Sequence, residues 1–316
     1  MPPFTLFEDV EKLLFDFEET LKKHDVKIQP GSNLDTVCLA VLDLLHKKNT
    51  PQLVDPKRDL RHYFAGILGV KTFMTKVVAL RDHVDFPQVV PHLRKLNCGQ
   101  VAQNSPSGVL DQVSPKLFEL LIALAAMRIG TNLEVDDPDR SSGGKNPDIL
   151  VTVDNVRYGL ACKAVFGHST PTLVQNIEKG IDQIERSPAD AGFVIVNVKD
   201  LINHNFCWPS PEDVEFPDGA EVDNVAWPDL TPVHSYLYGL ANKRVLDMER
   251  EIELPVLRDL FSGKKAIPVV THFLHTATAL AGPTSPVATS VLFLHCYGFG
   301  ATIMGKLNDA LQDHTV

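Results

Sequence analysis

The chain has 316 residues, of which 44% are hydrophobic and 22% are charged, and its formal net charge at pH 7 is −10. These values match ordinary globular proteins and exclude disordered, collagen-like and low-complexity chains. No apolar run reaches the roughly 18 residues of a membrane span, and acidic residues interrupt the apolar stretch at the N-terminus, so the sequence predicts neither a membrane contact nor a signal peptide.

The charge is distributed unevenly along the chain. Residues 1–110 sum to +1 and the remainder to −11, and residues 201–242 contain no Lys or Arg. A long nucleic-acid footprint needs a basic face, so any such contact is expected to be local. The five cysteines include no CxxC pair, which predicts a reducing compartment, the cytoplasm, and no zinc ribbon.

Residues 1–108 are expected to form a helical domain or subdomain. Thr5 and Glu8 have the spacing of a capping box, and apolar residues follow at helical intervals to Leu21. Further helices are expected over about 34–46, 60–80 and 87–96, before Pro and Ser punctuation near 104–107. A structural or partner-binding role is favoured here, so a protein partner or a second copy of the chain would bind through this region.

Residues 109–316 are expected to form an α/β domain. An apolar helix is predicted over 114–129, followed by strands over about 132–135, 147–153 and 156–165, with a tight turn at Asp154-Asn155. A helix over 171–186 and a continuous apolar strand over 191–198 come next. Strand, helix and strand in this order predict a right-handed crossover in a mixed sheet.

The C-terminal part opens with an acidic, Pro-rich stretch near 203–233, whose length predicts a surface excursion. Trp208 and Trp227 lie in it, and cover for the sheet explains them better than base stacking. A helix is predicted over 233–251 and a strand over 290–297, with helix again after Gly300. Residues 267–280 fit either helix or strand.

Asp148 and Lys163 are the first candidates for chemistry. Asp148 lies at the start of one predicted strand and Lys163 late in the next, so a hairpin can bring the two side chains together. A carboxylate there can hold a divalent cation with its waters. Such an ion activates water and neutralises a phosphate, and a lysine can orient or deprotonate the nucleophile.

Glu119 is the only charged residue between Leu117 and Met127. Because Glu is rarely buried without a partner, three explanations remain open: exposure at an edge, a structural ion pair, or a role in a site.

These residues occur in a familiar order: Glu119 on a helix, then Pro147-Asp148, then an apolar strand ending in Ala161-Cys162-Lys163, then a helix and an apolar strand. The order resembles the PD-(D/E)XK nuclease superfamily, also called the restriction-endonuclease-like fold, over roughly residues 114–200. The resemblance implies a mixed sheet flanked by helices, bound Mg²⁺ or Mn²⁺, hydrolysis of phosphodiesters and a nucleic-acid partner.

The resemblance also implies a role for each residue. Asp148 would be the central metal ligand and the backbone carbonyl of Cys162 a further ligand. Lys163 would orient the attacking water, and Glu119 would be the helix carboxylate.

One position departs from the family pattern. The acidic residue expected two positions before the lysine is Ala161, and a methyl group cannot coordinate a hard cation. In one reading the acid has migrated to the following helix, where Glu178 lies on the flank of the apolar stripe and would be a catalytic metal ligand. In the other, the metal site has decayed and Lys163 only neutralises a carboxylate. Gln183 is polar on that helix and fits either a solvated face or a place near a phosphate.

Weaker candidates are explained more simply. His272 and His275 would be neighbours on a helix, and with His295 they could hold zinc, but no signature connects them. Cys162 lies in an apolar strand, where an inert thiol is favoured over a nucleophile. Two main hypotheses therefore remain: a metal-dependent nuclease for DNA or RNA, and a nuclease fold kept as a binding or assembly module.

Overall fold

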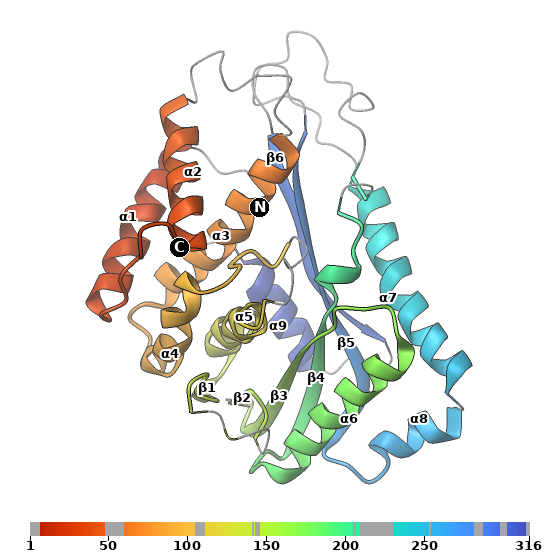
Figure 1. Ribbon diagram of the computed structural model, residues 1–316. Coiled ribbons are helices and arrows are strands. Elements are labelled where there is room, and N and C mark those ends of the chain that lie inside the picture. Colours follow the sequence, from red (N-terminus) through yellow and green to blue (C-terminus); the bar gives the residue numbers. More distant parts are fainter. Residues whose placement is uncertain are drawn as a thin grey trace.

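The computed structural model describes residues 7–47, 60–104, 111–140, 142, 146–204, 207–208, 230–252, 254–280, 287–297 and 302–313. Six strands form one mixed sheet in the order β1-β2-β3-β4-β5-β6 (Figure 1). The strands are β1 (Thr131–Val135), β2 (Ile149–Val153), β3 (Val156–Ala164), β4 (Ala191–Asn197), β5 (Ala266–Leu280) and β6 (Val287–Tyr297). No helix in these ranges is long and apolar enough to span a membrane.

The strand directions follow the predicted order of elements. β1, β2 and β3 form an antiparallel meander, and β4 pairs parallel to β3 after a helical crossover. β5 is parallel to β4, and β6 returns antiparallel to β5. Residues 267–280, which fit either helix or strand in the sequence, therefore belong to strand β5.

The β2–β3 hairpin sets the position of the candidate residues. Asp154 and Asn155 have φ angles of 50° and 64°, as a tight two-residue turn requires, which confirms the predicted turn. Ile149 lies opposite Leu160, so Asp148, one residue before β2, reaches the level of residues 161–163.

One face of the sheet is covered by the N-terminal helices together with α5 and α9, on the left and in the centre of Figure 1. These helices are α1 (Phe7–Lys23), α2 (Asn33–Lys47), α3 (Leu60–Leu80), α5 (Ser114–Ile129) and α9 (Thr302–Gln312). Their buried side chains form one cluster with those of the sheet. The predicted helical region is thus present, and it shares its core with the strands.

The helix predicted over 87–96 is broken into short pieces. They are η2 (Phe86–Val89), α4 (Val90–Leu93) and η3 (Arg94–Asn97). Pro87 and Pro91 each stand in the first turn of a piece. A proline has no N–H to donate and is tolerated there but not inside a helix, which explains why one long helix does not form.

The other face carries α6 (Thr170–Arg186), α7 (Thr231–Glu251) and α8 (Leu254–Phe261), on the right of Figure 1, over a second core cluster. The short turn η4 (Lys199–Leu201) follows β4. The chain is therefore α/β, with a mixed sheet flanked by helices. Trp208 is buried, and its indole donates to Thr276 Oγ1 of β5 at 3.0 Å, so it covers the sheet as predicted. Trp227 and most of the acidic excursion lie outside the described residues.

Candidate functional site

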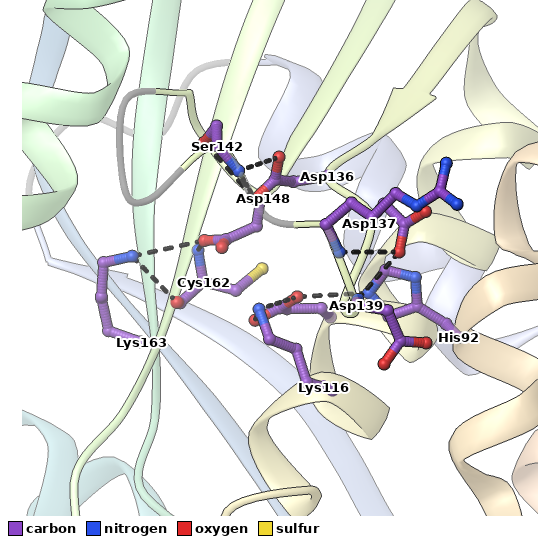
Figure 2. Close-up of polar contacts among 11 residues, drawn as sticks. His92, Lys116, Asp136, Asp137, Asp139, Ser142, Asp148, Cys162 and Lys163 are labelled. Carbon is purple, nitrogen blue, oxygen red and sulfur yellow. Dashed lines mark hydrogen bonds and ion pairs between the residues drawn. The ribbon is translucent and has the colours of Figure 1, made fainter.

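The structure brings Lys163 and Asp148 together. Lys163 Nζ lies 3.3 Å from Asp148 Oδ2 and donates to the Cys162 carbonyl oxygen at 3.2 Å. It also donates to Gln183 Oε1 of α6. Two oxygen atoms that the family resemblance implies as metal ligands thus meet the predicted lysine at the end of the β2–β3 hairpin away from its turn (Figure 2).

Asp148 is almost fully buried. Its Oδ2 accepts a hydrogen bond of 2.7 Å from the backbone N–H of Cys162, in addition to the contact with Lys163. Burial and then the nearby Glu119 charge raise the pKa of this carboxyl, whereas Lys163, Lys116 and the Cys162 N–H oppose that shift. Burial therefore favours the neutral form of this carboxyl, and the donors and cations around it favour the charged form.

Glu119 lies within the apolar part of α5 and is only 4% exposed, so the edge-exposure explanation is wrong. Lys116 Nζ approaches its two carboxylate oxygens at 2.8 and 3.0 Å, and His92 Nε2 lies 3.3 Å away. Burial alone would lower the pKa of Lys116, but the Glu119 charge and hydrogen bonds outweigh it and raise that pKa. A structural ion pair, one of the three explanations left open for Glu119, is thus present.

We call Lys116, Glu119, Asp148 and Lys163 the charge cluster. The charge of Asp148 also raises the pKa of Lys116, so the two ion pairs interact. Figure 2 shows Lys163 and Asp148 beside the Cys162 backbone, with Lys116 and His92 nearby. Two carboxylates from different elements are therefore arranged around two ammonium groups.

A loop that leads into β2 lies against the cluster. The backbone N–H of Asp136 donates to the Asp148 carbonyl at 2.9 Å. The carboxylate of Asp136 accepts the Ser142 N–H at 3.1 Å and contributes to the raised pKa of Lys116. This third carboxylate was not among the candidates, because its distance from the cluster depends on how the loop turns back.

Glu178 is not brought to the cluster. It is exposed on α6 and lines a groove of about 470 Å³ between α6 and α8. A helix turns by about 100° per residue, so Gln183, five positions later, points in a different direction and is the α6 residue that contacts Lys163. The α6 side chain that contacts Lys163 is thus a neutral amide and not the carboxylate of Glu178.

Ala161 is fully buried under α6. A Cβ atom placed on Gly180 of α6 would lie 3.3 Å from the Ala161 Cβ and 2.8 Å from a methyl of Val194. The helix therefore approaches the sheet so closely that position 161 has no space for a carboxylate side chain in this packing.

The donor set for a metal ion is small. In the described ranges no group of three or more His, Cys, Asp or Glu side chains could hold one by itself. Mg²⁺ commonly uses one or two carboxylates and completes its shell with water. Asp148 and the Cys162 carbonyl meet beside Lys163, whereas Glu119 is paired with Lys116 and acts on Asp148 through its charge.

The three histidines do not form a zinc site. His272 and His275 are three residues apart in strand β5, so their side chains point to opposite faces of the sheet. His272 lies opposite His295 in the β5–β6 pair, whereas the ring of His275 packs edge-on against Phe273, 6.2 Å away. Burial, Asp148 and Glu119 raise the pKa of the Cys162 thiol well above its ordinary value, which fits an inert thiol.

Besides Asp136, three residues of the site were not predicted as members. Lys116 precedes Glu119 by three positions, a helical ion-pair spacing that could have been noticed. Gln183 was recognised only as polar. His92 gave no signal, because its approach to Glu119 depends on the packing of the short turns on α5.

The chain matches no protein-family model, and comparison with curated proteins and with solved structures gave no match.

The raised pKa of Asp148 predicts a dependence of stability on pH. A carboxyl whose pKa is raised on folding stabilises the protein at low pH, and this contribution is lost as the pH rises through the folded pKa. We therefore expect wild type to lose stability relative to Asp148→Asn as the pH rises from about 4, the ordinary pKa of an aspartate, through the raised pKa of Asp148.

Urea unfolding at several pH values measures this difference. Asp182→Asn removes an exposed carboxylate of α6 and controls for net charge. If wild type instead gained stability over Asp148→Asn as the pH rises, Lys163 would hold the Asp148 pKa below its ordinary value.

Proposed function

We propose that this chain is a metal-dependent phosphodiester hydrolase acting on DNA or RNA, built on a restriction-endonuclease-like core. The observation that carries the proposal is the position of Lys163 Nζ, 3.3 Å from the Asp148 carboxylate and 3.2 Å from the Cys162 carbonyl. The order of elements supports it as well, because α5, the β1–β3 meander, α6 and the parallel strand β4 follow one another as the resemblance implies.

Asp148, Glu119 and the Cys162 carbonyl would hold Mg²⁺ or Mn²⁺. A bound divalent cation lowers the pKa of a water ligand and neutralises charge on a phosphate. Lys163 would donate to the attacking water and hold it in line with the phosphorus. Gln183, which accepts from Lys163, would fix the direction of the ammonium group.

The energetics of burial also support a functional role. Replacing a buried ion pair by well-packed apolar side chains is often neutral or stabilising. The charge cluster lies in a layer made almost entirely of apolar residues on α5 and the sheet. Stability alone therefore does not explain why four charged groups are retained there.

A second candidate function is a binding or assembly module on the same fold. Two observations favour it: Ala161 is packed against α6 at the position of the missing acid, and each lysine of the charge cluster already has a carboxylate partner. In that case the cluster only neutralises its own charges.

A cleavage assay tests the proposal. Mixed single-stranded and double-stranded DNA and RNA are incubated with Mg²⁺ or Mn²⁺ and wild type, Lys163→Ala or Lys12→Ala. We expect wild type to cleave and Lys163→Ala to be slower by about 10²–10⁴-fold, the usual contribution of a proton-transferring or water-positioning group. Lys12 is an exposed lysine of α1, so its variant should match wild type.

No cleavage by wild type, or equal cleavage by wild type and Lys163→Ala, would refute the nuclease proposal. Calorimetry then separates the two candidates. Heat of Mn²⁺ or Mg²⁺ binding to wild type that is lost in Asp148→Asn supports a metal site, whereas no binding to wild type supports the assembly module.

A further inference from the structure

A second polar site lies at the start of α6, at the opposite end of that helix from Gln183. Arg244 extends from the middle of α7, is 4% exposed, and donates from Nη1 to the His168 carbonyl at 2.6 Å. His168 stands two residues before α6 begins. Gln183 lies 13 positions after Thr170, roughly 20 Å further along the helix. Lys163 pairs with Val196 and Val196 pairs with His272, so the Cα atoms of Lys163 and His272 are about 10 Å apart across the sheet.

The remaining donors of Arg244 are orphaned. Within the described residues, Nε and Nη2 are buried and have no hydrogen-bond partner. These two N–H groups form one edge of the guanidinium, the fork that binds carboxylate or phosphate through two parallel bonds. The bond from Nη1 fixes the plane of the group, so this edge is already oriented.

No carboxylate of α7 takes that place. Asp247 and Glu251 act on Arg244 only through space, and burial still lowers the pKa of the guanidinium. Asp247 is instead bonded to Lys243 on the outer side of the helix. Among the described residues no anion is hydrogen-bonded to this buried guanidinium. Such an arrangement is costly, which indicates an anionic partner.

His272 of β5 is the second orphan. It is fully buried, and neither ring nitrogen has a hydrogen-bond partner among the described residues. Burial, His295 and Arg244 lower its pKa to about 3, so the ring is neutral and offers one N–H donor. His295 has a partner, since its Nε2 lies 2.9 Å from Asn242 Oδ1.

The start of α6 has the matching polarity. Its N-cap residue Ser169 makes no side-chain capping bond, and no acidic residue stands in the first turn. The free N–H groups and the dipole of a helix N-terminus favour a negative charge. The same end of the sheet holds the carboxyl ends of the parallel strands β3 and β4, where ligands commonly bind in α/β proteins.

We propose that Arg244, His272 and the N-terminus of α6 bind a phosphate group. The Nε and Nη2 atoms of Arg244 donate to two of its oxygens and His272 to a third. The four orphaned nitrogens are shielded from solvent, so charge-assisted hydrogen bonds there are strong, and entry of the phosphate displaces the side chains that now cover them. The phosphate is either free or part of a nucleotide.

Thermal unfolding of the full chain tests this site. Potassium phosphate is titrated against potassium chloride at equal ionic strength, with wild type, Arg244→Met and Lys243→Met. A ligand that binds only the folded state raises the melting temperature in proportion to the logarithm of its concentration. We expect this rise for wild type and Lys243→Met but not for Arg244→Met. Lys243 has the same charge on the neighbouring position and is exposed, so it is a matched control.

Equilibrium dialysis with labelled inorganic phosphate keeps the proposal falsifiable if Arg244→Met does not fold. Arg244→Lys keeps the charge but loses the fork, and we expect it to bind phosphate about tenfold or more weakly than wild type. His272→Leu removes two orphaned nitrogens, so it should melt at a higher temperature without phosphate and show a smaller phosphate shift.

The same dialysis is repeated with an unlabelled nucleoside monophosphate or a short DNA oligonucleotide as competitor. Only a compound whose phosphate enters the site displaces the labelled phosphate, so the two competitors distinguish the sources. Equal melting temperatures in phosphate and chloride, no bound label on wild type, or wild-type affinity in Arg244→Lys would each overturn the proposal.

Discussion

Phe118→Ala is expected to lower the free energy of unfolding by about 3–5 kcal/mol, the usual cost of removing a buried phenyl ring. Phe118 is 1% exposed on α5, and its ring centre lies 5.0 Å from that of Phe273 on β5. Both belong to the core cluster that joins the N-terminal helices to the sheet. Phe15→Ala, at an exposed phenyl ring of α1, should change stability by less than about 0.5 kcal/mol.

Urea unfolding followed by far-ultraviolet circular dichroism and by tryptophan fluorescence gives the measurement. Because the helical layer and the sheet share one core, we expect the two probes to report one transition in wild type and in Phe118→Ala. A separate transition for the helices would show that residues 1–108 fold as an independent domain.

The second large effect is expected at Gly180, where α6 approaches the sheet. Gly180→Leu should lower the free energy of unfolding by about 1–3 kcal/mol, because the new side chain collides with Val194 and Ala161. That loss appears in spite of the better helix propensity of leucine. The displaced helix would also move Gln183 away from Lys163, so any cleavage activity should fall with stability.

Gly239→Leu on α7 is the matched control. A Cβ at Gly239 meets no atom within 4 Å, so the substitution should be neutral or stabilising by up to about 1 kcal/mol. Guanidinium unfolding of both variants measures the contrast. Equal stability in the two would mean that α6 has room at Ala161, and the explanation given for the missing acid would be wrong.

The order and type of most elements could be predicted, because they depend on neighbours in the sequence. The helix over 114–129 follows from an apolar run opened by Ser114-Pro115, and the hairpin around Asp154-Asn155 follows from its turn residues. The meeting of Asp148 and Lys163 could also be predicted, since a two-residue turn fixes the register of the strands on either side.

The broken helix at 87–96 was predicted incorrectly, although its prolines were visible in the sequence. Residues 267–280 were ambiguous for another reason: a long apolar segment buried on both faces of a sheet has no alternation that separates strand from helix. Both misjudgements concern segments in which the local pattern was weak or interrupted.

The sequence by itself determined which residues stand at the ends of β2 and β3, and so the pairing of Asp148 with Lys163. Only the tertiary structure decided that Gln183 rather than Glu178 reaches that lysine, that Glu119 is paired with Lys116 and His92, and that Arg244 faces the start of α6. The physical reason is that a strand register is fixed by a short turn, whereas the rotation and approach of a packed helix depend on the side chains of every layer that it contacts.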